Sequence, residues 1–213
     1  MPRALIFANG NSGSLDALRA IPQPGDVFIA ADGGARLAKA LGIIPAIIIG
    51  DFDSLPESEI QAFVKQGVDL QRHPPAKDET DLELALFYAL CAGYAPILIL
   101  GAFGGRLDQA LGNLALLSSP EALQVDIRLE DGLTEAFFVR NRAAIHGSPG
   151  DTVSFIPWGL PVERVTTTGL LYPLRDEILY PYSTRSISNE MLEQTASVSL
   201  ESGLLLCIHI RKN

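Results

Sequence analysis

The first 130 residues alternate short apolar runs with longer helical patterns, and this alternation most constrains the fold. Apolar runs cover residues 27–31, 46–49 and 96–100, and residues 80–91 carry apolar side chains at helical spacing. Parallel strands joined by helices give such a pattern. We therefore expect residues 1–130 to form a Rossmann-like α/β/α domain with a mostly parallel sheet.

The pattern changes near Glu130. From Asp151 onward, short β-branched or alternating segments replace the helical stripes. We expect residues 131–213 to form an antiparallel β-sandwich domain. Its expected strands are residues 152–156, 162–168, 177–180, 196–200 and 204–210. The last two flank Glu201-Ser202-Gly203, a turn that predicts a hairpin.

Charge and hydropathy exclude several classes of protein. The net charge of −9 argues against a nucleic-acid surface, which needs a basic stripe, but not against ATP, because a metal ion can reverse the local sign. No apolar run approaches ~18 residues, so we expect no membrane span and a cytoplasmic protein. The sequence Gly-x-x-x-x-Gly-Lys-Ser/Thr does not occur, which excludes a P-loop enzyme.

Four aspartates stand just past the ends of three apolar runs: Asp32, Asp51, Asp53 and Asp108. If the runs are neighbouring parallel strands, these carboxylates converge on the edge where open α/β sheets bind ligands. Clustered carboxylates stay ionised together only if a cation holds them, which predicts a Mg²⁺ site beside a nucleotide phosphate. Taken singly, each motif has a plainer interpretation as a tight turn or a helix cap.

Two further segments carry charge at helix starts. Lys77-Asp78-Glu79-Thr80-Asp81 precedes the clearest helix, with Thr80 and Glu83 spaced as a capping box. The helix dipole explains acidic residues at this helix start but not the basic Lys77. The presence of Lys77 therefore suggests that an anion binds nearby. Gly104-Gly105-Arg106-Leu107-Asp108-Gln109 could place backbone N–H groups and a guanidinium against a phosphate, although a flexible turn with a surface arginine would look similar.

Taken in order, these segments resemble the thiamine pyrophosphokinase family. The resemblance rests on Asp32-Gly33-Gly34, Gly50-Asp51-Phe52-Asp53-Ser54, Lys77 to Glu83, Gly104 to Gln109, Ile187-Ser188-Asn189-Glu190 and the closing stretch from Ala196. It implies an α/β domain, a β-sandwich domain and a homodimer with thiamine near the subunit interface. It also implies transfer of the pyrophosphoryl group of ATP to the hydroxyl of thiamine, with Mg²⁺, giving thiamine diphosphate and AMP.

The resemblance also implies roles for individual residues. Asp51, Asp53 and Asp81 match the family's metal-binding acids, and we expect them to act in catalysis with Arg106. Arg106 and Lys77 would neutralise the migrating pyrophosphoryl oxygens. The remaining expected ATP contacts are Asp32, Gly33, Thr80, Gly104, Gly105, Asp108 and Gln109, and the expected thiamine contacts are Ser188 and Asn189.

Two departures from the family pattern concern the substrate sites. Gln109 stands where many bacterial members carry histidine, and the final expected strand lacks the tryptophan that stacks on thiamine in some members. Trp158, Tyr172, Tyr180 and Tyr182 could stack on a flat ring, although such aromatics more often belong to a core.

Three other functions remain open from the sequence. A haloacid-dehalogenase-like phosphohydrolase also carries Asp-x-Asp after an apolar strand, although usually on its first strand, whereas Asp51-Phe52-Asp53 follows the third one here. The same transfer could act on another small alcohol, such as a pterin. A non-catalytic sensor of nucleotide or thiamine is disfavoured because all the acids are present.

Overall fold

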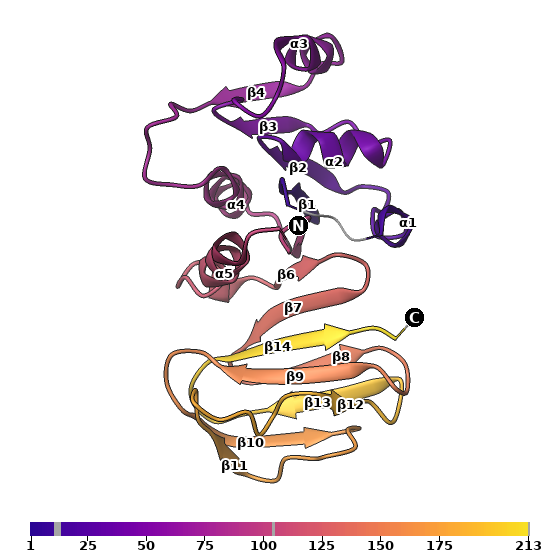
Figure 1. The fold of residues 1–213 in the computed structure, drawn as a ribbon, viewed down its shortest axis with the longest axis vertical. Coiled ribbons are helices and arrows are strands. Elements are labelled where there is room, and N and C mark those ends of the chain that lie inside the picture. Colours follow the sequence, from indigo (N-terminus) through magenta and orange to yellow (C-terminus); the bar gives the residue numbers. More distant parts are fainter. Residues whose placement is uncertain (11–13, 104, 213) are drawn as a thin grey trace. The chain divides into compact units, whose positions relative to one another are not determined.

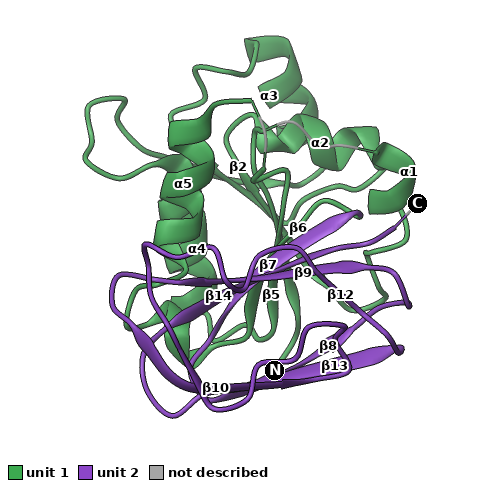
Figure 2. Cartoon of the chain, turned by 60° about the horizontal axis from the view of Figure 1, so that its bottom comes forward, with its two compact units in different colours: residues 1–132 green, residues 133–213 purple. Residues whose placement is uncertain are grey.

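A computed structural model describes residues 1–10, 14–103 and 105–212. Two compact units make up the chain, residues 1–132 and residues 133–213 (Figure 2). The first is mixed α/β with a mostly parallel sheet, and the second contains antiparallel strands.

The sheet of the first unit contains six parallel strands in the order β6-β5-β1-β2-β3-β4 (Figure 1). The strands are β1 (Ala4–Phe7), β2 (Val27–Ala31), β3 (Ile47–Gly50), β4 (Asp69–Arg72), β5 (Ile97–Leu100) and β6 (Ile127–Glu130). Strands β1 and β3 are buried at every residue, as expected for a sheet covered on both faces. Because β2 to β4 extend the sheet on one side of β1 and β5 and β6 on the other, the strand order reverses between β1 and β5.

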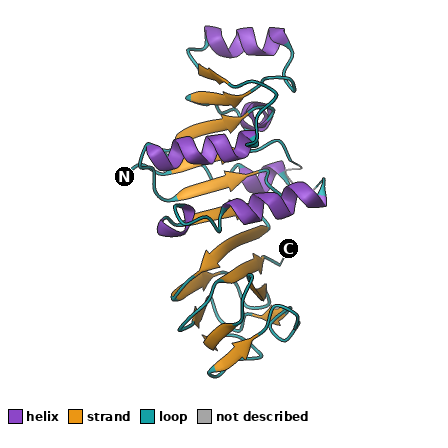
Figure 3. Cartoon of the chain, turned by 90° about the vertical axis from the view of Figure 1, so that its left-hand side faces the viewer, coloured by secondary structure: helices purple, strands orange, loops and turns teal. Residues whose placement is uncertain are grey.

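Helices cover both faces of this sheet (Figure 3). They are α1 (Leu15–Leu18), α2 (Gly34–Ala40), α3 (Glu57–Lys65), α4 (Asp81–Cys91), α5 (Leu107–Leu116) and the 3₁₀ helix η1 (Ala122–Gln124). Helices α1, α2 and α3 share one apolar cluster with Leu5, Phe7 and Ile48 of the strands. Helix α4 contacts β1, β2 and β3, and α5 contacts α4.

Helix α4 begins where the sequence predicted. The Thr80 hydroxyl accepts a hydrogen bond from Glu83 N (3.1 Å), which caps a helix end whose first N–H groups have no intrahelical partner. Leu82, Ala85, Leu86 and Ala89 form its buried stripe. The cap fixes where α4 starts, and so holds Asp81 in the first turn beside the carboxyl ends of the strands.

The second unit consists of two antiparallel sheets that share one apolar core. One sheet has the order β7-β14-β9-β12, and the other β8-β13-β10-β11. The strands are β7 (Thr134–Val139), β8 (Arg142–His146), β9 (Thr152–Pro157), β10 (Val162–Thr168), β11 (Glu177–Leu179), β12 (Asn189–Glu190), β13 (Thr195–Ser199) and β14 (Leu205–Ile210). Phe137, Phe155 and Cys207 of the first sheet and Ile145, Val165 and Val198 of the second belong to this core.

The hairpin predicted around Glu201-Ser202-Gly203 is wrong. Strand β13 pairs with β8 and β10, whereas β14 pairs with β7 and β9, so the connection crosses from one sheet to the other. A bridge between Ser202 and Glu163, and the close approach of Gly203 to Val162, fix this crossing. Strands β7, β8 and β12 were not predicted. No helix in the described part of the chain is long and apolar enough to cross a membrane.

Candidate active site

A cavity of about 520 Å³ opens at the carboxyl ends of the parallel strands in the first unit. Asn9 and Gly10 after β1 and Ala102 after β5 line it, so it lies where the strand order reverses. Ligands of open α/β sheets bind in this crevice. Its volume falls within the usual range of small-molecule sites, roughly 300–1,000 Å³.

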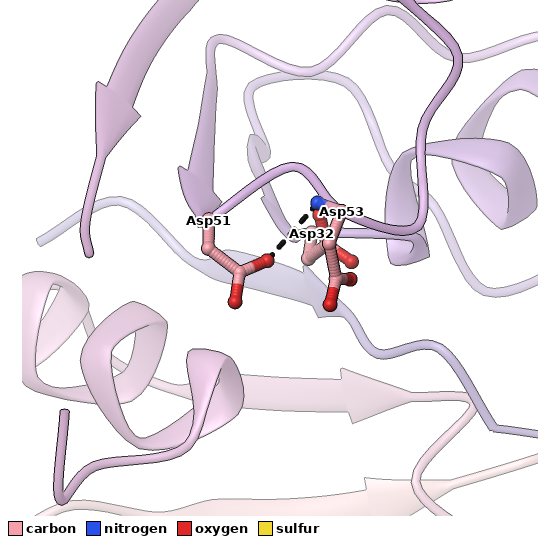
Figure 4. Close-up of side chains that lie close together, drawn as sticks. All are labelled: Asp32, Asp51 and Asp53. Atoms are coloured by element: carbon pink, nitrogen blue, oxygen red, sulfur yellow. Dashed lines mark hydrogen bonds between the residues drawn. The ribbon is translucent and has the colours of Figure 1, made fainter. Parts of the chain in front are cut away.

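Three carboxylates meet in this cavity (Figure 4). Asp32 follows β2, and Asp51 and Asp53 follow β3. One carboxylate oxygen of each lies within 4.8 Å of the others. Asp51 Oδ1 accepts a hydrogen bond from Asp53 N (3.0 Å), so the short turn itself holds the two acids side by side. This is the convergence that the sequence predicted for these three aspartates.

Gly50 permits the close approach of these acids. A Cβ atom at this position would lie 2.8 Å from Asp32 Cβ and 3.2 Å from Asp81 Cγ. The first distance is too short for two carbon atoms, so any side chain here would push Asp32 away. Because Gly50 has no side chain, Asp32 after β2 and Asp81 of α4 can both lie close to the end of β3.

The carboxylate cluster fits a hard divalent cation. Asp32 is buried, and its Oδ1 has no hydrogen-bond partner among the described residues. A buried acceptor without a partner loses its hydrogen bonds to water and forms none in the protein, which destabilises the folded state. Three carboxylates this close also repel one another unless a cation stands between them. Oxygen ligands of this kind are those that Mg²⁺ and similar ions prefer.

Lys77 and Asp81 stand beside the cluster. Lys77 Nζ lies 2.8 Å from Asp81 Oδ1 and 3.8 Å from Asp51 Oδ2. The Asp81 contact is a close ion pair, and Asp81 Oδ1 has no further partner among the described residues. Burial raises the pKa of Asp81, and the nearby Asp51 and Asp32 raise it further against the effect of Lys77. Burial lowers the pKa of Lys77, but the attraction of Asp81, Asp51 and Asp32 outweighs it, so this pKa is raised overall.

The structure therefore groups the acids differently from the predicted metal set. Asp32 joins Asp51 and Asp53 in the close cluster, while Asp81 pairs with Lys77 of the loop before α4. Both Asp81 and Lys77 line the cavity. The predicted role of Asp81 as a metal ligand stays a prediction.

The start of α5 and the loop before it also line the cavity. Gly105, Arg106 and Gln109 line it as expected, whereas Gly104 lies outside the described residues. Arg106 donates two hydrogen bonds to the carboxylate of Asp108, and this pairing lowers the pKa of Asp108. Asp108 is 65% exposed and does not line the cavity, so its expected convergence with the other aspartates does not occur.

Some site residues differ from the sequence-based expectation. The side chain of Asn9 occupies the space where Gly33 would carry a Cβ, 2.5 Å away, so Gly33 permits close packing and does not itself line the cavity. Thr80 does line the cavity while capping α4. Asn9 and Asn113 also line it and were not predicted. Asn113 lies one helical turn after Gln109, a polar spacing in an apolar helix that could have revealed it.

Comparison with known proteins identifies the family. Residues 20–129 match the family profile described as thiamin pyrophosphokinase, catalytic domain. Residues 141–205 match the profile described as thiamin pyrophosphokinase, vitamin B1 binding domain. The chain belongs to the thiamin pyrophosphokinase family.

Relatives of the thiamin pyrophosphokinase family cover nearly the whole chain. The thiamine pyrophosphokinase of Bacillus subtilis is 33% identical over 205 residues, which are 95% of this chain and 96% of the relative. Thiamine pyrophosphokinase 1 of Arabidopsis thaliana is 28% identical over 177 residues, 79% of this chain and 66% of the plant protein. The family match favours pyrophosphoryl transfer over the haloacid-dehalogenase-like hydrolysis considered from the sequence.

Solved thiamin pyrophosphokinase structures share the fold. The crystal structure from Bacillus subtilis, 31% identical, has a TM-score of 0.89 and covers 99% of this chain and 100% of that one. The structure from Enterococcus faecalis, 29% identical, has a TM-score of 0.85 with the same coverage. The Candida albicans structure is 17% identical with a TM-score of 0.79, covers 98% of this chain and 89% of that one, and shows likeness of fold alone.

The segment that resembles the family's thiamine site lies in the second unit. Ser188 is exposed and adopts a left-handed conformation with φ of 59°, and its N–H donates to Ser154 Oγ (3.0 Å). The buried Asn189 amide holds the backbone of Tyr172 at both ends, accepting from Tyr172 N (3.0 Å) and donating to Tyr172 O (2.7 Å). Asn189 thus fixes an aromatic residue that is 59% exposed.

Proposed function

We propose that this chain transfers the β,γ-pyrophosphoryl group of ATP to the hydroxyl of thiamine, giving thiamine diphosphate and AMP, and that it uses Mg²⁺. The observation that carries the proposal is the meeting of Asp32, Asp51 and Asp53 with Lys77 in one cavity of a chain that belongs to this family. A complex of a metal ion with a triphosphate carries both signs of charge. The aspartates suit its metal ion, and Lys77 suits its phosphate groups.

The cation would be held by Asp32, Asp51 and Asp53, with Asp81 as the further ligand that the family resemblance implies. When bound, a divalent ion supplies charge neutralisation to the phosphate oxygens in phosphoryl transfer. Support comes from the unpartnered Oδ1 of Asp32 and from the 4.8 Å grouping of the three acids.

The chain's cationic and polar groups would bind and orient the triphosphate. Lys77 exchanges its ion pair with Asp81 for pyrophosphoryl oxygens, and Arg106 approaches them from the start of α5. Backbone N–H groups near Gly105 and the amides of Gln109 and Asn113 provide further donors. Phosphoryl transfer depends mainly on alignment and charge neutralisation, which such groups supply.

The second unit would bind thiamine through Ser188 and Tyr172. The thiazolium ring of thiamine is a flat cation, which is attracted to the face of an aromatic ring. Asn189 holds the backbone of Tyr172 through two hydrogen bonds, and its own contact with thiamine stays a prediction. We also propose a homodimer, which the exposed apolar side chains of Phe87, Leu107 and Leu111 on α4 and α5 support.

The test is a product assay with ATP, Mg²⁺ and a panel of vitamin-like alcohols that includes thiamine and a pterin alcohol. We expect AMP and thiamine diphosphate in equal amounts, and no comparable AMP with the pterin. AMP formation with the pterin alone would assign another acceptor. Release of inorganic phosphate from simple phosphoesters would favour hydrolysis, and tight ATP binding without AMP would favour a sensor.

A further inference from the structure

The turn that carries Asp51 and Asp53 contains a strained residue. Phe52 has a φ of 66°, a left-handed conformation that bulky side chains rarely adopt. Such a residue persists only where its surroundings over-determine it. The Phe52 ring is buried in the apolar cluster of the first unit, and the Asp53 N–H closes the turn on Asp51 Oδ1. The strained conformation is therefore what sets the two carboxylates side by side.

Arg72 holds this turn from the neighbouring strand. It is the last residue of β4 and pairs in register with Gly50, the residue before Asp51. Its guanidinium lies 4.7 Å from the centre of the Phe52 ring, and Nη1 donates a hydrogen bond to Asp51 O (3.2 Å). One planar group thus contacts the ring of the strained residue and the peptide that precedes it.

Two features separate Arg72 from the cationic residues already described. Arg72 is not among the described residues that line the cavity, whereas Lys77 and Arg106 are. It also contacts the backbone of Asp51 and not a carboxylate. Arg72 therefore contacts the cation site through the backbone of the turn and not through a metal-binding carboxylate.

We propose that Arg72 is a positioning residue for the cation site, holding the turn of Asp51 and Asp53 in its metal-binding conformation. The inference rests on the proposed function, because it takes these acids as metal ligands. Arginine suits the position because its flat guanidinium stacks on a ring while donating hydrogen bonds in its plane, which an ammonium group cannot do. Groups that orient metal ligands typically contribute about 10–100-fold to metal affinity.

The test measures binding of Mn²⁺, as a paramagnetic substitute for Mg²⁺, to the full chain by electron paramagnetic resonance. We expect Arg72→Ala to weaken Mn²⁺ binding by about tenfold, and Arg72→Lys to recover only part of the loss. The matched control is Arg36→Ala, which removes an exposed arginine that pairs with Glu59 in the same unit. Thermal unfolding in EDTA should show similar midpoints for Arg72→Ala and Arg36→Ala.

A second variant separates positioning from general stability. Phe52→Leu keeps an apolar side chain but removes the ring on which Arg72 stacks, so Arg72→Ala should cost less Mn²⁺ affinity in that background. Unchanged Mn²⁺ binding in Arg72→Ala, or a loss equal in both backgrounds, would overturn the proposal while leaving the proposed function intact. Failure of the wild-type chain to bind Mn²⁺ would reject the metal assignment and this proposal together.

Discussion

Asp32 shows how the site's function and its stability oppose each other at the scale of one residue. Its carboxylate is buried, has an oxygen without a hydrogen-bond partner in the described chain, and lies near two other acids. Burying charge of one sign is unfavourable unless a partner compensates it. Without a metal ion, the positive charge that lies against these acids is the ammonium group of Lys77. Lys77 contacts Asp81 more closely than it contacts Asp51.

We therefore expect Asp32→Asn to stabilise the protein in EDTA. Removing one of the clustered charges should raise the unfolding midpoint by about 2–4 °C, which corresponds to about 1 kcal/mol for a chain of this size. Added Mg²⁺ should raise the wild-type midpoint by mass action but should affect Asp32→Asn much less. Differential scanning calorimetry measures both effects.

The control is Asp16→Asn, which removes an exposed aspartate of α1 that pairs with Arg19, the residue after this helix. Its midpoint should respond to Mg²⁺ as the wild type does. A lower midpoint for Asp32→Asn in EDTA would show that its charge is favourable without a metal and would contradict our account of the cluster.

Individual site residues were predictable where their position follows from the strand pattern. Asp32, Asp51 and Asp53 each follow a buried strand, and parallel strands bring such positions to one edge. Asp108 lies beyond a longer loop, within α5, where its side chain pairs with Arg106 instead. Asn9 could not be identified, because its contact with Gly33 depends on how α2 packs after β2.

At the scale of elements, the two units differ in how far local pattern determines structure. Strands and helices of the first unit follow from hydrophobic periodicity, because β1 and β3 are buried at every residue and α4 carries a continuous buried stripe. In the second unit, β13 and β14 are adjacent in sequence but belong to different sheets. A short turn alone does not specify whether the chain folds back or crosses the core, so the hairpin prediction failed.

A buried histidine joins three segments of the second unit. His209 on β14 contacts Glu135 Oε1 of β7 (3.0 Å) and Asp151 Oδ2, just before β9 (2.9 Å). Burial lowers the pKa of His209, but the two carboxylates outweigh this effect and raise it above its ordinary value. Burial raises the pKa of Asp151, but hydrogen bonds from Lys212 N, Ser148 N and His209 lower it overall. Arg211 also approaches Glu135 (3.9 Å).

We expect His209 to make stability depend on pH. Because its folded pKa is raised, the stabilisation is fully present below about pH 6.5 and declines as pH rises through the folded pKa. His209→Gln should therefore destabilise the chain more at pH 6 than at pH 9. The loss at pH 6 should be about 3 kcal/mol, as for other buried ion pairs that lose one partner.

Urea unfolding of wild type and variant at both pH values measures the difference. His146→Gln is the matched control, because His146 of β8 is exposed and its Nδ1 lies 3.3 Å from the Thr195 hydroxyl. An equal loss for His209→Gln at both pH values would mean that the imidazole acts as a neutral group.

At the scale of the whole molecule, exposed apolar side chains predict association. Phe87, Leu107 and Leu111 are 65%, 75% and 50% exposed, and α5 has no fully buried residue. Light scattering should therefore give a molar mass of two chains, twice the 22.9 kDa of one. A monomer at the concentrations used for the activity assay would contradict the proposed homodimer.

The central claim is that acids from two strands share one divalent cation at the point where the strand order reverses. Anomalous diffraction from crystals grown with Mn²⁺ tests it most directly. We predict a manganese peak within roughly 2.0–2.3 Å of carboxylate oxygens from Asp32, Asp51 and Asp53. A manganese ion located elsewhere, with these three side chains turned away from one another, would contradict the shared cation site.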